Sequence, residues 1–217
     1  MGFFELLEQS MPLFLMGMKL TLELSFVSLA IAMVIGIVAS LMGMSSVPIF
    51  RVINRTFVAI IRGTPLLVQG YFIYFGLTGV LGIRMTAFTA GVIALSLNAG
   101  GYMSEIFRGG IQAVDPGQTE AARSLGLSKS QTTWRIIIPQ AIRICIPSVV
   151  NQWCITIKDT SIISVLGLAE LTKMGSQIIA RTFRSFEVWI MVGILYFIVI
   201  YLLTILAHIV ERKVSLD

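Results

Sequence analysis

Long stretches without a charged residue limit most strongly how this chain can fold. Residues 24–50, 63–83, 85–104 and 188–210 each lack Asp, Glu, Lys and Arg. An α-helix needs about 20 apolar residues to cross the hydrocarbon core of a bilayer. Charged residues make up 12% of the chain, whereas a soluble domain typically has about 25%. The sequence therefore predicts an integral membrane protein.

A fifth stretch, residues 136–157, contains Arg143, Pro139 and Pro147. We expect it to span as well, because a helix packed against neighbours can hold a proline and an inward-facing charge. The fold class is thus an all-α integral membrane protein with one domain over residues 1–217. Its five expected transmembrane helices lie near residues 20–43, 54–79, 85–107, 136–157 and 187–210.

The distribution of basic residues predicts the orientation in the membrane. They are densest in the loop 108–135, and cytoplasmic loops carry the excess of Lys and Arg. We therefore expect this loop and the C-terminus to be cytoplasmic and the N-terminus to be external. The N-terminal stretch contains Glu5 and Glu8 but no basic residue before Lys19, so a cleaved signal peptide is not expected. The mixed segment 158–187 is expected to form a partly embedded helical hairpin on the external side.

The sequence offers no catalytic residue and no metal site. Its two cysteines, Cys145 and Cys154, would lie about 13 Å apart along a helix, too far for a disulfide. His208 is the single histidine. A phosphate-binding loop needs Gly-Lys-[Ser/Thr], and no lysine here follows a glycine. No basic run alternates with aromatic residues, so no nucleic-acid partner is expected.

The loop 108–135 contains a short predicted helix. Asp115 is a good N-cap, Pro116 fits the first helical position, and Gln118 would complete a capping box. Gly126 would end the helix. The residues that leave one side with little side chain are Ala121, Ala122 and Gly126. Such a helix suits either a plain connection or close approach by another protein.

The pattern Glu120, Ala121, Ala122, Gly126 and, nine residues on, Ile136, Ile138 and Pro139 resembles the coupling-loop signature of ABC-importer membrane subunits. Ile138 stands where the signature has leucine. The stretches RGTPLLVQ from Arg62, NAGGYMSEIFRGGI from Asn98 and IKDTSIISVLGLAEL from Ile157 resemble the polar-amino-acid branch of that family. The resemblance covers nearly the whole chain. It implies the type I importer fold, with residues Glu120 to Gly126 on a cytoplasmic coupling helix.

The resemblance also implies the partners. They are a second copy or a homologous permease subunit, two cytoplasmic ATP-binding subunits that hold ATP and magnesium, an external amino-acid-binding protein, and the amino-acid substrate. The chain itself would be no enzyme, would bind no cofactor and would lie in the bacterial inner membrane. The alternative is a secondary transporter driven by an ion gradient. That class requires an internal repeat with broken helices in both halves, and none is visible.

Polar residues within the third expected span are candidates for the substrate path. Asn98 and Glu105 are seven residues apart, about two helical turns, and therefore share a face. Charged and polar groups inside a membrane tend to face a cavity. For Glu105 the alternative is an ion pair with Arg108 at the cytoplasmic interface.

Asp159 and Thr160 follow the fourth expected span and are further candidates. A carboxylate and a hydroxyl suit the ammonium and carboxylate of an amino acid. The alternative for Asp159 is local neutralisation of Lys158.

The segment from Arg62 through Thr64 to Pro65 interrupts the second expected span. Pro65 has no N–H, so it frees the carbonyl of Ile61, four residues back. Broken helices at membrane depth are tolerated where they line a cavity or pack within protein. Arg62 and Thr64 are therefore candidates for the substrate path, and a simple kink is the alternative.

Overall fold

The structure, a computed structural model, describes residues 2–215, apart from the side chains of residues 208 and 210–215. The side chain of His208 and the C-terminal residue Asp217 thus lie outside the described part. All regular elements within residues 2–215 are helical. In chain order they are α1 (Phe3–Gly43), α2 (Pro48–Gly63), α3 (Leu66–Tyr71), η1 (Phe72–Gly76), α4 (Leu77–Leu81), α5 (Ala87–Gln112), α6 (Pro116–Ser124), α7 (Lys129–Thr132), η2 (Thr133–Ile137), α8 (Ile138–Ile163), η3 (Ser164–Leu166), α9 (Leu171–Thr182) and α10 (Ser185–Ser215).

Three continuous helical stretches in the described residues are long and apolar enough to cross a membrane. They are Phe3–Gly43, Lys129–Leu166 and Ser185–Ala207. A fourth span is reached if α2 and the helices after it count as one broken span. The expected span 85–107 corresponds to α5, which has 26 residues but is not among these stretches. The count of five spans therefore stays a prediction.

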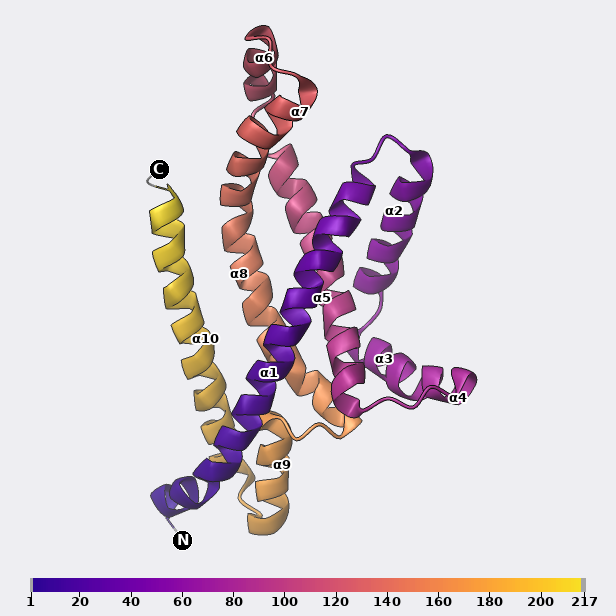
Figure 1. Cartoon of the computed structure of the whole chain (residues 1–217). Helices are drawn as coiled ribbons and strands as arrows, with labels where there is room; N and C mark the ends of the chain where they lie inside the picture. The colour runs from indigo at the N-terminus through magenta and orange to yellow at the C-terminus, as the bar shows by residue number, and fades with distance from the viewer. Residues whose placement is uncertain (1, 216–217) are drawn as a thin grey trace.

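The helix α5 is less apolar than these three stretches because its centre consists of small and polar residues. Ser96, Asn98 and Ser104 are buried there, and α5 makes its most extensive contact with α1 (Figure 1). A Cβ on Gly100 would lie 2.6 Å from the Ile35 side chain, and one on Gly36 would lie 2.6 Å from Met103. Small residues allow this close approach of two helices within a membrane.

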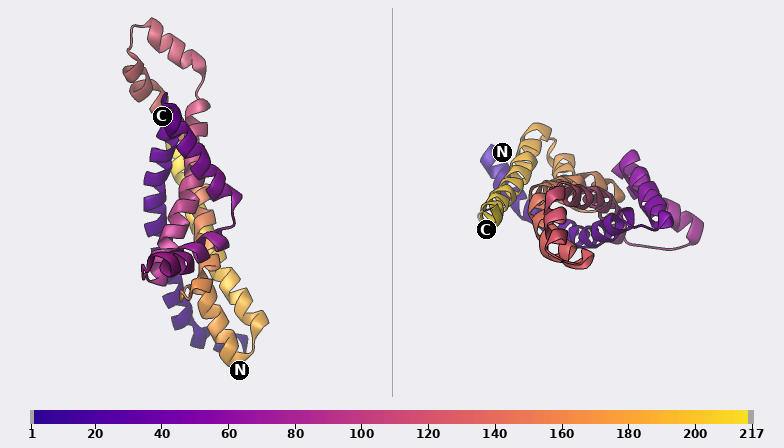
Figure 2. Two further views of the ribbon diagram at one scale, coloured as in Figure 1. Left: turned by 90° about the vertical axis from the view of Figure 1, so that its right-hand side faces the viewer. Right: turned by 90° about the horizontal axis from the view of Figure 1, so that it is seen from above.

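The region of the second expected span, residues 54–79, is not one straight helix, because the chain turns sharply within it. The axes of α2 and of the segment Leu66–Leu81 differ by 106°. We call residues 66–81 the arm. It extends to one side of the other helices, as Figures 1 and 2 show. The break lies at residues 64–65, where the sequence predicted an interruption. Three aromatic residues of the arm, Tyr71, Phe72 and Phe75, are exposed, and aromatic side chains of this kind are typical of membrane interfaces.

The ends of the molecule are clearly separated. The start of α1 and the helix α9 lie at one end, whereas α6 and α7 lie at the other, toward which α10 ends (Figures 1 and 2). The expected hairpin over residues 158–187 takes the form of α9 folded between the end of α8 and the start of α10.

A buried carboxylate joins the helices at the α9 end. Glu170 is fully buried and caps α9 by accepting a 2.7 Å hydrogen bond from the Lys173 N–H. Its second oxygen accepts a 2.8 Å bond from the Tyr196 hydroxyl of α10. On the α1 side, Thr21 Oγ1 accepts a 3.2 Å bond from the Leu171 N–H. Burial raises the pKa of the Glu170 carboxyl, and the hydrogen bonds it accepts oppose that rise.

These contacts predict that Glu170 stabilises the packing of α9 on α10. Glu170→Leu removes the acceptor of the Lys173 N–H, and an unpaired buried polar group costs about 1–3 kcal/mol. The Tyr196 hydroxyl loses its shorter bond and keeps its contact with the Thr172 hydroxyl. We expect a clear loss of stability in thermal unfolding of the detergent-purified protein. Glu170→Gln keeps an oxygen for one donor and should lose less. Equal stability of the leucine variant and the wild type would contradict this role.

Candidate functional site

At the break between α2 and α3, side chains supply the hydrogen bonds that backbone N–H groups would otherwise donate. Because Pro65 has no N–H, the Ile61 carbonyl lacks its helical partner, as the sequence predicted. The Gln69 side-chain N–H₂ group fills this place, with Nε2 2.8 Å from Ile61 O, 2.9 Å from Thr64 Oγ1 and 3.1 Å from Thr64 O. The Thr64 hydroxyl in turn donates to Ile60 O over 2.8 Å. Carbonyls at the end of α2 are thus paired despite the break.

The helix α5 reaches the break through Asn98. Its Nδ2 donates to Gln69 Oε1 over 3.1 Å, and only 8% of Asn98 is exposed. Asn98 and Thr64, both expected in the substrate path, are therefore connected through Gln69. Sequence reasoning missed Gln69. The available signal was an amide within an otherwise uncharged run, four residues after the proline.

A charged cluster lies on the same side of α5, two turns further along. Arg108 holds Glu105 with two bonds, Nη2 to Oε2 at 2.6 Å and Nε to Oε1 at 3.2 Å. Arg62 from α2 lies 4.0 Å from Glu105 and 5.3 Å above the Tyr102 ring. The alternative expected for Glu105, an ion pair with Arg108, is therefore present. Because two arginines share one carboxylate, the cluster carries an excess positive charge, and the Arg62 side chain is 47% exposed.

Asp159 and Thr160 differ although they are neighbours on α8. Asp159 is half-buried and makes no hydrogen bond to the residues that the structure describes. It interacts with Lys158 through charge, so local neutralisation of Lys158 stays an alternative. Thr160 is fully buried, and its hydroxyl donates to Ile157 O over 2.7 Å. Of the two, only Asp159 has a polar group available for a ligand.

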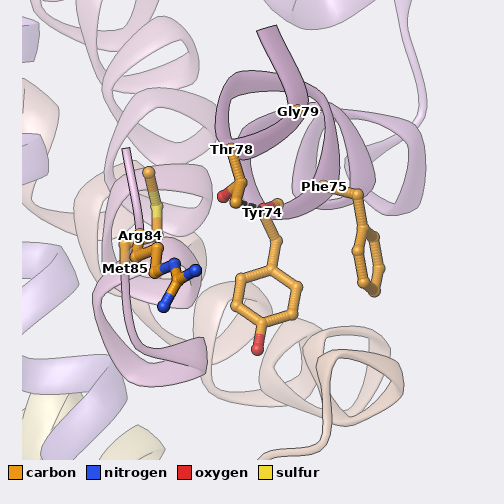
Figure 3. A pocket seen from close by; sticks show the side chains of 6 residues that line it. All are labelled: Tyr74, Phe75, Thr78, Gly79, Arg84 and Met85. Atoms are coloured by element: carbon orange, nitrogen blue, oxygen red, sulfur yellow. Dashed lines mark hydrogen bonds between the residues drawn. The ribbon is translucent and has the colours of Figure 1, made fainter. Parts of the chain in front are cut away.

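A shallow hollow of about 460 Å³ lies at the far end of the arm (Figure 3). In Figure 3 the Tyr74 ring and the Arg84 side chain face the same space. None of the expected path residues lines it; the lining residues are Tyr74, Phe75, Thr78, Gly79, Arg84 and Met85. The hollow is therefore separate from the groups gathered at the helix break.

The predicted helix of the 108–135 loop is α6, and its start follows the prediction in part. Pro116 is the first helical residue, and Asp115 caps it by accepting a 2.7 Å bond from the Gly117 N–H. The expected capping box with Gln118 is wrong. The Gln118 side chain instead accepts a 3.4 Å bond from Gln140 at the start of α8, so a tertiary partner replaces the local one.

The end of α6 is a glycine cap, as predicted. Gly126 has φ +84°, its N–H donates to Arg123 O, and the Leu127 N–H reaches back to Ala122 O over 3.1 Å. This is the Schellman arrangement, in which a left-handed residue closes the helix.

The small-residue side of α6 is only partly available to a partner. Glu120 and Ala121 are exposed, whereas Ala122 is 5% exposed and packs against the chain itself. Leu125, which the sequence did not single out, is 84% exposed. The surface that α6 offers therefore combines Glu120, Ala121, Leu125 and Gly126 at the tip of the molecule (Figure 1).

Apolar helices long enough to cross a membrane, with charged groups at a broken helix, are typical of an integral membrane protein with a polar path. Over residues 32–216 the sequence matches the family described as "Binding-protein-dependent transport system inner membrane component", and the chain belongs to this family. It is a multi-pass inner-membrane transport subunit and not an enzyme, because ATP is hydrolysed by a separate subunit of such systems. Within the described residues, no group of three or more His, Cys, Asp or Glu is placed to hold a metal ion.

Relatives and solved structures agree with this assignment. The chain is 39% identical to the glutamine transport system permease protein GlnP of Escherichia coli K12, over 95% of each chain. It is 37% identical to the arginine transport system permease protein ArtQ of Bacillus subtilis, over 94% of this chain and 93% of the relative. A crystal structure of an amino acid ABC transporter with histidines has a TM-score of 0.93 and 40% identity, with 98% of this chain and 99% of that chain covered. The methionine ABC transporter MetNI, at 20% identity and a TM-score of 0.81, shares the fold over 95% of this chain and 98% of that chain.

Proposed function

We propose that the chain is the permease subunit of an ABC importer that carries polar amino acids inward. The observation that supports this most is similarity over nearly the whole length to permeases named for glutamine and arginine transport. The charges near the break suit such a substrate. An amino acid carries a carboxylate and an ammonium, and Arg62 and Asp159 have groups of the opposite charge available.

The proposed substrate path includes the break and the faces of α5 and α8 that carry these groups. Arg62 would bind the substrate carboxylate, and Asp159 would bind the ammonium. Glu105 holds Arg62 and Arg108 by charge, while Asn98, Thr64 and the buried Thr160 shape the wall. Buried charges in a membrane protein typically mark such pathways.

The proposed assembly places the α6 end in the cytoplasm, with the N-terminus outside and five spans between them. A second copy or a homologous permease subunit pairs with the chain. Two cytoplasmic ATP-binding subunits, which hold ATP and magnesium, dock on α6 of each permease subunit. An external binding protein delivers the amino acid at the opposite end. The basic loop 108–135 supports this orientation.

Transport in this assembly would follow from a rigid-body movement. ATP binding changes the separation of the two ATP-binding subunits, and α6 carries that displacement into α5 and α8, the helices on either side of its loop. Domain rotations of this kind switch a protein between two discrete states. The substrate path would open alternately to the outside and the inside.

The energy source separates this proposal from an ion-gradient transporter. Proteoliposomes that contain the permease, its ATP-binding subunits and the binding protein should accumulate amino acid when ATP is present and no ion gradient exists. An imposed proton or sodium gradient without ATP should give no accumulation. The reverse pattern would favour the secondary transporter.

The substrate path predicts a specific effect of removing the Asp159 charge. A hydrogen bond to a charged group contributes roughly 1.5–3 kcal/mol, so Asp159→Asn should weaken amino-acid affinity by about tenfold or more. Binding can be measured by calorimetry on the detergent-purified complex, with membrane level and ATPase association unchanged. Glu23→Gln is the matched control, because Glu23 is an exposed carboxylate paired with Lys19. Unchanged affinity for Asp159→Asn would exclude this contact.

The coupling proposal predicts that Gly126→Arg disconnects transport from ATP. The left-handed backbone at Gly126 costs a non-glycine residue about 1 kcal/mol, and the arginine adds bulk to the docking surface. We expect normal membrane level, weak co-purification of the ATP-binding subunits and loss of uptake. Gly126→Asn is the control, because Asn tolerates this conformation. Full ATPase binding and uptake in Gly126→Arg would show that α6 is only a connection.

A further inference from the structure

We propose that Gln69 is a positioning residue that fixes the helix break and joins it to α5, so that Asn98 acts on transport through Gln69 rather than by touching the substrate. The proposal rests on the substrate path described above. It assigns a function to a residue that lies at the end of the stretch RGTPLLVQ but was not among the expected site residues.

The orientation of both amides is set by the chemistry of their neighbours. Ile61 O and Thr64 O are carbonyls and can only accept, so Gln69 must turn its N–H₂ group toward them. Its oxygen is then left facing α5, and Asn98 must present its own N–H₂ group to that oxygen. A flip of either amide would place like groups against each other. The chain Asn98–Gln69–Ile61 is therefore a directed set of hydrogen bonds with one arrangement.

This set holds the residues at which the substrate charge would bind. Arg62 lies between Ile61 and Thr64, the two residues that Gln69 bonds. Arg62 is also drawn toward Glu105 of α5. The helix α5 thus holds the last turn of α2 at two points that are two turns apart. Asn98 acts there through Gln69, and Glu105 acts through Arg62.

Because of these contacts, the structure of the helix break depends on where α5 lies. A hydrogen bond weakens steeply once its distance or angle departs from the normal range. Displacement of α5 by about 1 Å relative to α2 would therefore break the bond from Asn98 and leave the Gln69 side-chain oxygen without its donor. Unpaired carbonyls are disfavoured at membrane depth, so the arm and Arg62 should move with α5 when the transporter changes state.

A double-mutant cycle tests whether Asn98 acts through Gln69. Gln69→Met, Asn98→Leu and the double variant are assayed for ATP-driven uptake in proteoliposomes with the ATP-binding subunits and the binding protein. Loss of one neutral hydrogen bond predicts about a fivefold decrease in maximal uptake rate for Asn98→Leu. Gln69→Met also removes the bonds to Ile61 and Thr64 and should decrease the rate at least as much. The amino acids imported per ATP should fall as well, while the KM for the loaded binding protein changes less than twofold. The double variant should be no slower than Gln69→Met.

Multiplicative losses in the double variant would overturn the proposal, as would unchanged uptake in Gln69→Met. If the apolar variants do not reach normal membrane levels, Gln69→Ala and Asn98→Ala, which introduce no charge, complete the cycle. Gln69→Glu removes the bonds donated to Ile61 O, Thr64 O and Thr64 Oγ1 but keeps an acceptor for Asn98, and should still lose coupling. Thr78→Val is the matched control, because Thr78 bonds carbonyls of Tyr74 and Ile83 on the same side of the molecule without reaching α5.

The same assays separate this proposal from the substrate path itself. Amino-acid binding to the detergent-purified complex should be weakened by Asp159→Asn. Asn98→Leu should change amino-acid affinity in the protein that has Gln69, and should have no further effect in the Gln69→Met variant. If Asp159→Asn leaves amino-acid affinity unchanged while the double-mutant cycle is non-additive, the proposed substrate path is wrong and the positioning role of Gln69 still holds.

Discussion

The requirement that every backbone carbonyl and N–H find a partner away from water underlies this whole structure. It restricts the spans to helices, and it must be met again wherever a helix breaks or begins inside the protein. At the α2 break Gln69 and Thr64 supply the missing partners. At the start of α9 the Glu170 carboxylate and the Thr21 hydroxyl do so. Polar side chains inside this protein thus bond the backbone first, including Thr64, which the sequence had assigned to the substrate path.

The parts of the fold that follow local rules could be predicted. Uncharged runs locate α1 and α10, Asp115 and Gly126 bound α6, and Pro65 marks the break. The parts that depend on distant partners could not. The 106° turn and the bond between Gln69 and Asn98 require α5 to lie beside the break, which no local pattern states. For the same reason the capping box at Gln118 failed, since Gln140 competes for that side chain.

The candidate site shows a similar division. The sequence pointed to the polar residues of α5, but not to which of them is already engaged. Glu105 is neutralised by arginines, and Asn98 is occupied by Gln69. Asp159 has no hydrogen-bond partner among the described residues and interacts with Lys158 through charge alone. Tertiary structure therefore separates groups that build the wall from groups left for a ligand, and a single sequence cannot make that distinction.

The composition of α5 has a consequence for biosynthesis. Its buried centre is polar enough that, unlike α1, it is not among the stretches apolar enough to cross a membrane by themselves. A helix of this kind gains less from lipid than α1 does, and its packing on α1, where Ala32 and Leu29 meet Ala99 and Met103, adds to its stability in the bilayer. Since α1 is synthesised first, it can act as an intramolecular chaperone that receives α5 as it leaves the translocon. Insertion and folding of this segment are then one event.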